Sequence, residues 1–307
     1  MRNAPECPQE TSGSQNRAKG IVAIVISAFG FSLMAMFVRL CDDFGGPVSA
    51  FQKGFFRNVV ALAIAAAVWW RMRAGEVAGR ASGPRPSFGS CALLLLRALL
   101  GTAGIFAHFY ALGKITIAEG LTLNKTAPFF TVLFAWAFLG ERAGRRHFLT
   151  LALAFMGVVL IAKPGFAGAS AMPLAIGLAS GVCAGGAYAC VRALRRHALS
   201  PSVIILFFSA FSCLASVPFM LAGFDPMTWR QVLILLGAGG GAAVGQFGIT
   251  MAYGYAAPKD IAVFDYSGIL FAAAFGFLFF GQVPDLPSVL GFALILLAAY
   301  LLARARP

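Results

Sequence analysis

The stretch EGLTLNKTAPFFTVLFAWAFLGE, residues 119–141, reads as an apolar helix with a charged interruption. Lys125 lies about a turn and a half into it, beside Asn124 and three residues before Pro128. Most of the other positions are aliphatic or aromatic. What this lysine can do depends on whether the helix lies in water, in a protein core or in lipid.

The composition of the whole chain indicates lipid. Of 307 residues, 60% are apolar and 11% are charged, whereas a soluble domain has about a quarter charged residues. The mean hydropathy is +0.83. Uncharged runs such as ALAIAAAVWW (61–70) and LALAFMGVVLIA (151–162) suit the hydrocarbon core, which a helix of about 20 apolar residues crosses. We therefore expect an all-α integral membrane protein.

Hydropathy predicts ten membrane-spanning helices. They cover approximately residues 20–41, 48–70, 91–114, 117–139, 147–162, 173–194, 203–221, 230–254, 261–280 and 287–303. Residues 1–19 are too polar and too long for the start of a signal peptide, and no A-x-A-like cleavage site follows the first apolar run. We predict that they form a disordered cytoplasmic tail.

The distribution of cations orients these spans. Sixteen of the 24 Lys and Arg residues fall on one side: Arg2, Arg17, Lys19, Arg71, Arg73, Arg80, Arg85, Arg142, Arg145, Arg146, Arg192, Arg195, Arg196, Lys259, Arg304 and Arg306. The other side holds Asp42, Asp43, Asp225 and Asp285 with scattered cations. The positive-inside rule then puts both termini in the cytoplasm and the chain in the cell (inner) membrane. The net charge of +13 fits this topology and contact with anionic membrane lipid, so no nucleic-acid partner is predicted.

The six cysteines, Cys7, Cys41, Cys91, Cys183, Cys190 and Cys213, form no CxxC or paired loop pattern. Most of them fall within predicted spans, where cysteine behaves as a small apolar residue. Neither a disulfide framework nor a metal site is predicted, and no cofactor is expected.

A shift of the chain over itself by 141 residues aligns its two halves. Gly113 then meets Gly254 and Gly140 meets Gly281, and many Phe, Ala and Leu positions between them coincide. Each half, residues 20–163 and 173–305, has five predicted spans. Because five is odd, the second half must cross the membrane in the opposite direction. Such inverted repeats are typical of secondary transporters, whose site lies near the membrane midplane between the repeats.

Three stretches resemble a known family: LRALLGTAGIFAHFYALGKITIAEG (96–120), FFTVLFAWAFLGER (129–142) and AYGYAAPKDIAVFDYSGILFAAAFGFLFFGQVPD (252–285). They look like the two halves of EamA-type members of the drug/metabolite transporter superfamily, over residues 20–305. The resemblance implies a ten-helix transporter in two five-helix repeats. It does not indicate the substrate, because the family carries amino acids, carboxylates, sugars, nucleotide derivatives, vitamins and drugs. Gln282 stands where the first half has Glu141, a departure that we expect to concern a loop.

Lys125 is the first candidate for substrate binding. It would lie about eight residues into its span, roughly 12 Å deep, where a lysine costs at least roughly 2.5–3.5 kcal/mol and must face protein or a watery cavity. Pro128 cannot donate to the carbonyl of Asn124, so we expect a kinked helix. Its inward face would carry Leu121, Asn124, Lys125, Pro128 and Val132. Pairing with an acid, or snorkelling outward, is the structural alternative.

The shift of 141 residues relates Asn124 and Lys125 to Asp265 and Tyr266. Asp265 is the one carboxylate clearly inside a predicted span. It could carry a proton, bind an amine or pair with Lys125 in one state of a transport cycle. Alternatively, it satisfies freed backbone groups or pairs with Lys259.

Other polar residues in the predicted spans are weaker candidates. Arg57 could bind an anion or bond carbonyls at a span end, and Arg97 is near enough to the cytoplasm to snorkel. His108 fits a proton relay or a hydrogen-bonded interior residue. Gln246, Thr250 and Tyr253 form a polar stripe, and Tyr188 lies on another span; such groups line small-molecule sites but also hold helices together. Two ladders, Gly177–Gly181–Gly185 and Gly237–Gly241–Gly245, predict close helix packing.

These features favour a secondary transporter with a central cavity. Because Lys125, Arg57 and Arg97 outnumber the one acid, we expect an anionic or zwitterionic metabolite, such as an amino acid or a carboxylate. The alternative is an exporter of drugs or other cations, although span 1 lacks the carboxylate that four-span pumps of the superfamily use there. An enzyme is not expected, since no nucleotide loop, HExxH or GxSxG occurs. Monomer and homodimer both stay open.

Overall fold

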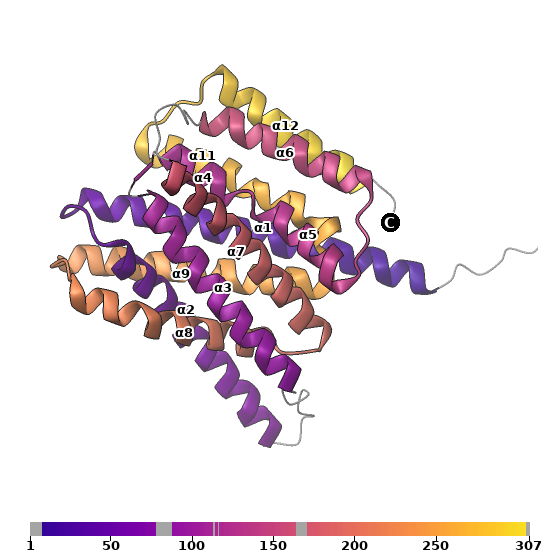
Figure 1. The fold of residues 1–307 in the computed structure, drawn as a ribbon, viewed down its shortest axis with the longest axis horizontal. Coiled ribbons are helices and arrows are strands. Elements are labelled where there is room, and N and C mark those ends of the chain that lie inside the picture. Colours follow the sequence, from indigo (N-terminus) through magenta and orange to yellow (C-terminus); the bar gives the residue numbers. More distant parts are fainter. Residues whose placement is uncertain (1–7, 78–87, 113, 116, 164–170, 305–307) are drawn as a thin grey trace, which may run out of the picture.

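The computed structural model describes residues 8–77, 88–112, 114–115, 117–163 and 171–304, and every element in these ranges is helical. In chain order the helices are α1 (Pro8–Asp43), α2 (Ala50–Val77), α3 (Phe88–Leu112), α4 (Ile117–Asn124), α5 (Ala127–Leu139), α6 (Arg145–Ala162), α7 (Ala171–Arg196), α8 (Pro201–Ala222), α9 (Trp229–Tyr255), α10 (Pro258–Ile261), the 3₁₀ helix η1 (Ala262–Tyr266), α11 (Ser267–Phe280) and α12 (Leu286–Arg304). Figure 1 shows them packed side by side along one main direction.

Nine helical segments among the described residues are long and apolar enough to cross a membrane, and one of them, Pro258–Phe280, contains α10, η1 and α11. The chain is therefore a multi-pass helical membrane protein. The predicted span 117–139 is not among the nine because it is divided into two short helices, α4 and α5.

The predicted tail is partly wrong. Helix α1 begins at Pro8, so residues 8–19 are helical and continue the first span; residues 1–7 lie outside the described ranges. One reason is that extending an existing helix costs far less than starting one. The other is tertiary: the guanidinium of Arg17 donates to the carbonyl of Leu302 in α12 over 2.5 Å.

The central helices form two groups, and each group mixes the two halves of the chain. We call α1, α9, α10, η1 and α11 the α1 group, and α3, α4, α5 and α7 the α7 group, because the members of each pack against one another. Helix α2 packs on α8 along one side of the molecule, and α6 packs on α12 along the opposite side (Figure 1).

Glycines allow the closest packing inside both groups. A Cβ on Gly241 of α9 would lie 2.8 Å from the backbone nitrogen of Met34 in α1. A Cβ on Gly185 of α7 would lie 2.5 Å from the Cβ of Phe130 in α5. Both glycine ladders therefore face a neighbouring helix at backbone contact, which confirms their predicted packing role.

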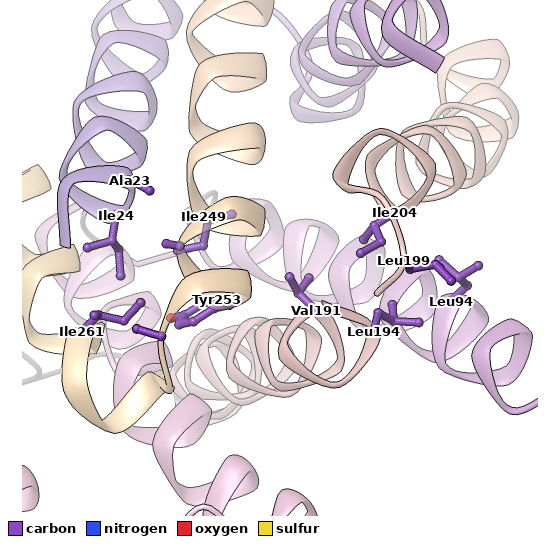
Figure 2. Packing of buried hydrophobic residues seen from close by; sticks show 12 residues of the cluster. Ala23, Ile24, Leu94, Val191, Leu194, Leu199, Ile204, Ile249, Tyr253 and Ile261 are labelled. Atoms are coloured by element: carbon purple, nitrogen blue, oxygen red, sulfur yellow. The ribbon is translucent and has the colours of Figure 1, made fainter. Parts of the chain in front are cut away.

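A buried apolar cluster joins the two groups at one end of the bundle (Figure 2). This is the end at which α3 begins and α7 and α9 finish, and we call it the Arg192 end after a residue discussed below. The cluster includes Ile24 of α1, Leu94 of α3, Val191 of α7 and Tyr253 of α9. Its largest side chains are almost completely buried, so the groups are packed tightly together here.

Candidate functional site

Two helices of the bundle are broken at positions that correspond under the shift of 141 residues. Helix α4 ends at Asn124 and α5 begins at Ala127, with Pro128 in its first turn. In the other half, η1 ends at Tyr266 and α11 begins at Ser267. The predicted kink is therefore a full break. The expected shared face from Leu121 to Val132 is wrong as drawn for one continuous helix, because the missing proline N–H and the turn at Lys125 separate the two parts.

Lys125 and Asp265 meet at these breaks. The ammonium nitrogen of Lys125 lies 3.3 Å from Oδ2 of Asp265, with 25% and 14% of the side chains exposed. The hydroxyl of Tyr266 donates to the carbonyl of Lys125 over 3.1 Å. Of the alternatives for Asp265, the structure contains the pairing with Lys125, while Lys259 instead donates to the carbonyl of Arg142. The two broken helices are thus tied to each other by one ion pair and one hydrogen bond.

Asn124 holds the end of α4 against α7. Its side-chain amide donates to the hydroxyl of Ser180 over 3.3 Å, and Ser180 donates to the carbonyl of Gly177. Serine is common in every helix of such a protein, so sequence reasoning did not single out Ser180. Its position one turn from two glycines of the α7 ladder is the signal that could have identified it.

Two tyrosines face each other across the boundary between the groups. The rings of Tyr188 in α7 and Tyr253 in α9 have centroids 5.9 Å apart at 44°. Both phenols interact electrostatically with Asp265, and Tyr188 also interacts with Arg57 and Arg97. These interactions connect the tyrosine pair to the Lys125–Asp265 pair and to the arginines.

Arg97 does not snorkel toward the membrane surface, so that expectation is wrong. Its side chain is buried at 3% exposure. The guanidinium donates to Oε1 of Gln246 in α9 over 3.2 Å and lies 4.0 Å from the ring centroid of Phe208. A hydrogen bond and a cation–π contact inside the bundle hold it there. Of the predicted stripe, Thr250 is used within α9, because its hydroxyl donates to the carbonyl of Gln246.

Arg57 of α2 is partly buried and has no ion pair or hydrogen bond within the described ranges; its Nε is completely buried. The guanidinium lies 5.7 Å from the ring centroid of Phe31. It interacts electrostatically with His108 and with Arg97, so the three side chains share one region. A partly buried guanidinium with a ring as its partner can still bind an anion through its free N–H groups.

Together these residues form a buried polar centre between the two helix groups. Lys125, Arg97 and Tyr188 come from the α7 group, and Gln246, Tyr253, Asp265 and Tyr266 from the α1 group. The centre contains three cations (Lys125, Arg57, Arg97) and one acid (Asp265), a formal surplus of two positive charges. Charges in a low-dielectric interior need partners, so the centre can accept a negatively charged group.

Buried charge at broken helices, inside a multi-pass helical bundle, defines the class of membrane transporters. Residues 18–163 match the EamA-like transporter family. The chain is 31% identical over 291 residues to a pseudopaline exporter, CntI, of Pseudomonas aeruginosa, covering 94% of this chain and 96% of that protein. It therefore belongs to the EamA-like transporters of the drug/metabolite transporter superfamily. It is a membrane transporter of small molecules rather than an enzyme.

Two further similarities agree with this assignment. A riboflavin transporter of Rhizobium johnstonii is 30% identical over 213 residues, covering 68% of this chain and 69% of that protein. A solved crystal structure superposes with a TM-score of 0.72 over 92% of this chain and 96% of the other, at 19% identity. That identity supports the fold alone.

Proposed function

We propose that the chain is a ten-span secondary transporter that moves a small anionic or zwitterionic metabolite, such as an amino acid or a carboxylate, by alternating access. Its two repeats are residues 20–163 and 173–305, in opposite orientations. The transporter lies in the inner membrane with both termini in the cytoplasm. The tenth span is the pair α4 and α5.

The packing of the helices supports the two repeats. Helix pairs occur in matching sets when the halves are exchanged: α1 packs on α9 as α7 packs on α3, and α1 packs on α11 as α7 packs on α5. Gly140 and Gly281 end α5 and α11 with left-handed φ values of 68° and 64°. Their N–H groups donate to the carbonyls of Ala135 and Gly276, which the same shift relates.

The arrangement of the polar centre supports alternating access. The centre lies where the two helix groups meet, and polar side chains supply much of the contact there: Lys125 with Asp265, and Arg97 with Gln246. Contacts of this kind can break and re-form when one group rocks against the other. The packed glycine surfaces lie inside each group, so each group can move as a unit.

The observation that carries the substrate class is the surplus of buried cations, above all Arg57, which lacks a charged partner among the described residues. A carboxylate or a phosphate would supply the missing charge. We assign substrate contacts to Lys125, Asn124, Arg57, Tyr266, Gln246, His108, Tyr253 and Tyr188. The alternative, a multidrug or cation exporter, would need a free acid, whereas Asp265 is already paired with Lys125. The named relatives carry organic molecules in either case.

A screen of solutes by thermal shift on the purified protein tests this proposal, since a ligand that binds the folded state raises its stability. Amino acids and small carboxylates should raise the melting temperature, and organic cations should not. Stabilisation by cations alone would instead favour the drug exporter.

Replacement of the central lysine makes the test specific. Lys125→Ala should abolish transport of the solute that the screen finds, while expression and folding stay near normal. Lys125→Arg should restore part of the activity, because its charge is kept but its geometry differs. Transport by Lys125→Ala at the wild-type rate would rule out a binding role for this residue.

A further inference from the structure

We propose that Arg192 is a latch that closes the transport path at the Arg192 end, and that Glu141 is the residue that positions it. The inference rests on the proposed alternating access. It concerns four residues outside the polar centre: Arg192, Glu141 and their counterparts in the other half, Arg39 and Gln282.

Arg192 connects the two helix groups directly. From α7, its Nε lies 2.7 Å from Oε1 of Glu141, the second residue after α5, so this ion pair lies within the α7 group. Its other nitrogen donates to the carbonyl of Tyr253 in α9, in the α1 group, over 3.0 Å. One guanidinium is therefore bound to both of the units that must separate for this end to open.

The acceptor in α9 suits a latch. Tyr253 lies in the last turn of α9, where carbonyls have no partner inside the helix and the helix dipole favours a cation. The bond therefore satisfies a group that would otherwise need water. The ring of the same tyrosine packs on Tyr188 beside the polar centre. The latch thus lies directly beyond the centre, along a path that Tyr253 also lines.

Glu141 fixes the position of the arginine. The side chains of Arg192 and Glu141 are 16% and 11% exposed, so little water competes for either. Oε2 of Glu141 is buried and has no hydrogen-bond partner among the described residues, while Arg196 lies farther away, at 3.9 Å. Removal of one partner would leave the other charge poorly compensated, which weakens packing at this end.

The corresponding pair in the other half is weaker. Arg39 lies against Gln282, with guanidinium nitrogens 3.2 and 3.3 Å from the amide oxygen once the amide is oriented to accept. Both residues are exposed, and both belong to the α1 group or the turn that follows α11. A carboxylate makes hydrogen bonds about twice as strong as a neutral amide does. The departure of Gln282 from Glu141, which we expected to concern only a loop, therefore distinguishes the two ends.

Cys190 reports on this end without any substrate. It is 6% exposed, lies two residues before Arg192 and belongs to the same helix. With the other five cysteines replaced by alanine, its reaction with a membrane-impermeant maleimide in nanodiscs measures how often the end opens. Glu141→Gln and Arg192→Gln should each raise the rate about fivefold, the ratio expected when a charge-assisted bond is replaced by an ordinary one. Arg39→Gln, the matched control, should leave the rate within twofold of the parent.

A charge exchange separates a latch from a structural ion pair. Glu141→Arg combined with Arg192→Glu restores two opposite charges but puts a carboxylate against the carbonyl of Tyr253, so labelling should stay fast. Arg192→Lys keeps a donor and should label at a rate between those of the parent and Arg192→Gln. Melting temperatures of all variants must stay near that of the parent, which the mild Glu141→Gln change favours.

Parental labelling in both Glu141→Gln and Arg192→Gln would overturn the latch, and so would slow labelling in the charge exchange. Neither result would affect the substrate proposal, because no solute is present in the assay. Conversely, fast labelling in the single variants with slow labelling in Arg39→Gln would support the latch even if the solute screen found no anion.

Discussion

Lys125 and Asp265 show how a single residue can be understood only with its partner. Each was a costly charge in a predicted span, and each alternative use left that cost open. In the structure the two charges lie 3.3 Å apart at the breaks of their helices. A pair at this place neutralises both charges while the substrate site is empty. A substrate carboxylate near Lys125 would compete with Asp265, which makes the carboxylate available for a second role.

That second role is proton coupling, and Asp265→Asn tests it. Asparagine mimics the protonated carboxyl, so the variant should lose accumulation driven by a pH gradient but keep counterflow of substrate. Uptake into proteoliposomes, with and without a gradient, measures both. Asp260→Asn is the matched control, since Asp260 faces His147 at the Arg192 end, 3.7 Å away, and should accumulate normally. Undiminished accumulation by Asp265→Asn would show that another group couples transport.

At the scale of elements, the broken helix α4–α5 determines where Lys125 lies. The N–H of Thr126 bonds to the carbonyl of Leu123, and its hydroxyl bonds to the same carbonyl over 2.6 Å. These bonds close a tight turn at the break, and Pro128 prevents the regular helical bond across it. The break is therefore a local property of the sequence TAP, reinforced by the contact with α7.

Pro128→Ala should lengthen one helix across this break. The new N–H can bond to the carbonyl of Asn124, so helix formation improves while Lys125 moves relative to Asp265. We expect a melting temperature equal to or above that of the parent and transport reduced several-fold. Circular dichroism and proteoliposome uptake would show this. Full transport by a normally folded variant would mean that the break has no role in positioning the lysine.

The contact between α1 and α9 makes a second prediction about elements, with adjacent residues as test and control. Gly241→Ala puts a Cβ 2.8 Å from the backbone of Met34, so the helices must separate at a cost of about 1–3 kcal/mol. Gly240→Ala meets nothing within 4 Å and should gain about 0.5–1 kcal/mol of helix propensity. Melting temperatures should therefore shift in opposite directions. Equal shifts would contradict the close packing.

At the scale of the whole molecule, the exchange of helices between halves builds the site. Neither half contains the polar centre alone, because the α1 group takes one helix from the first half and the rest from the second. The motion proposed for transport is thus a rearrangement of two mixed groups, and the apolar cluster and Arg192 hold them together at one end.

The orientation of the molecule is testable by cysteine labelling in intact cells. Cysteines introduced near Arg80 and Arg306 should react only after the membrane is permeabilised, because the positive-inside rule puts these loops in the cytoplasm. Cysteines near Asp42 and Asp225 should react from outside. A C-terminus accessible from the periplasm would contradict the proposed ten spans.

The sequence by itself determined the membrane class, the family, most helix boundaries and the identity of the costly charges, because hydropathy, glycine spacing and lone ionisable residues are local signals. It could not determine which charges meet. The Lys125–Asp265 pair joins residues 140 positions apart, and Arg97 is retained in the bundle by Gln246 and Phe208 rather than by its distance from the membrane surface. The helical start of α1 likewise depends on α12. Partners of this kind are decided by the packing of distant helices, and only the tertiary structure brings them within reach of a hydrogen bond.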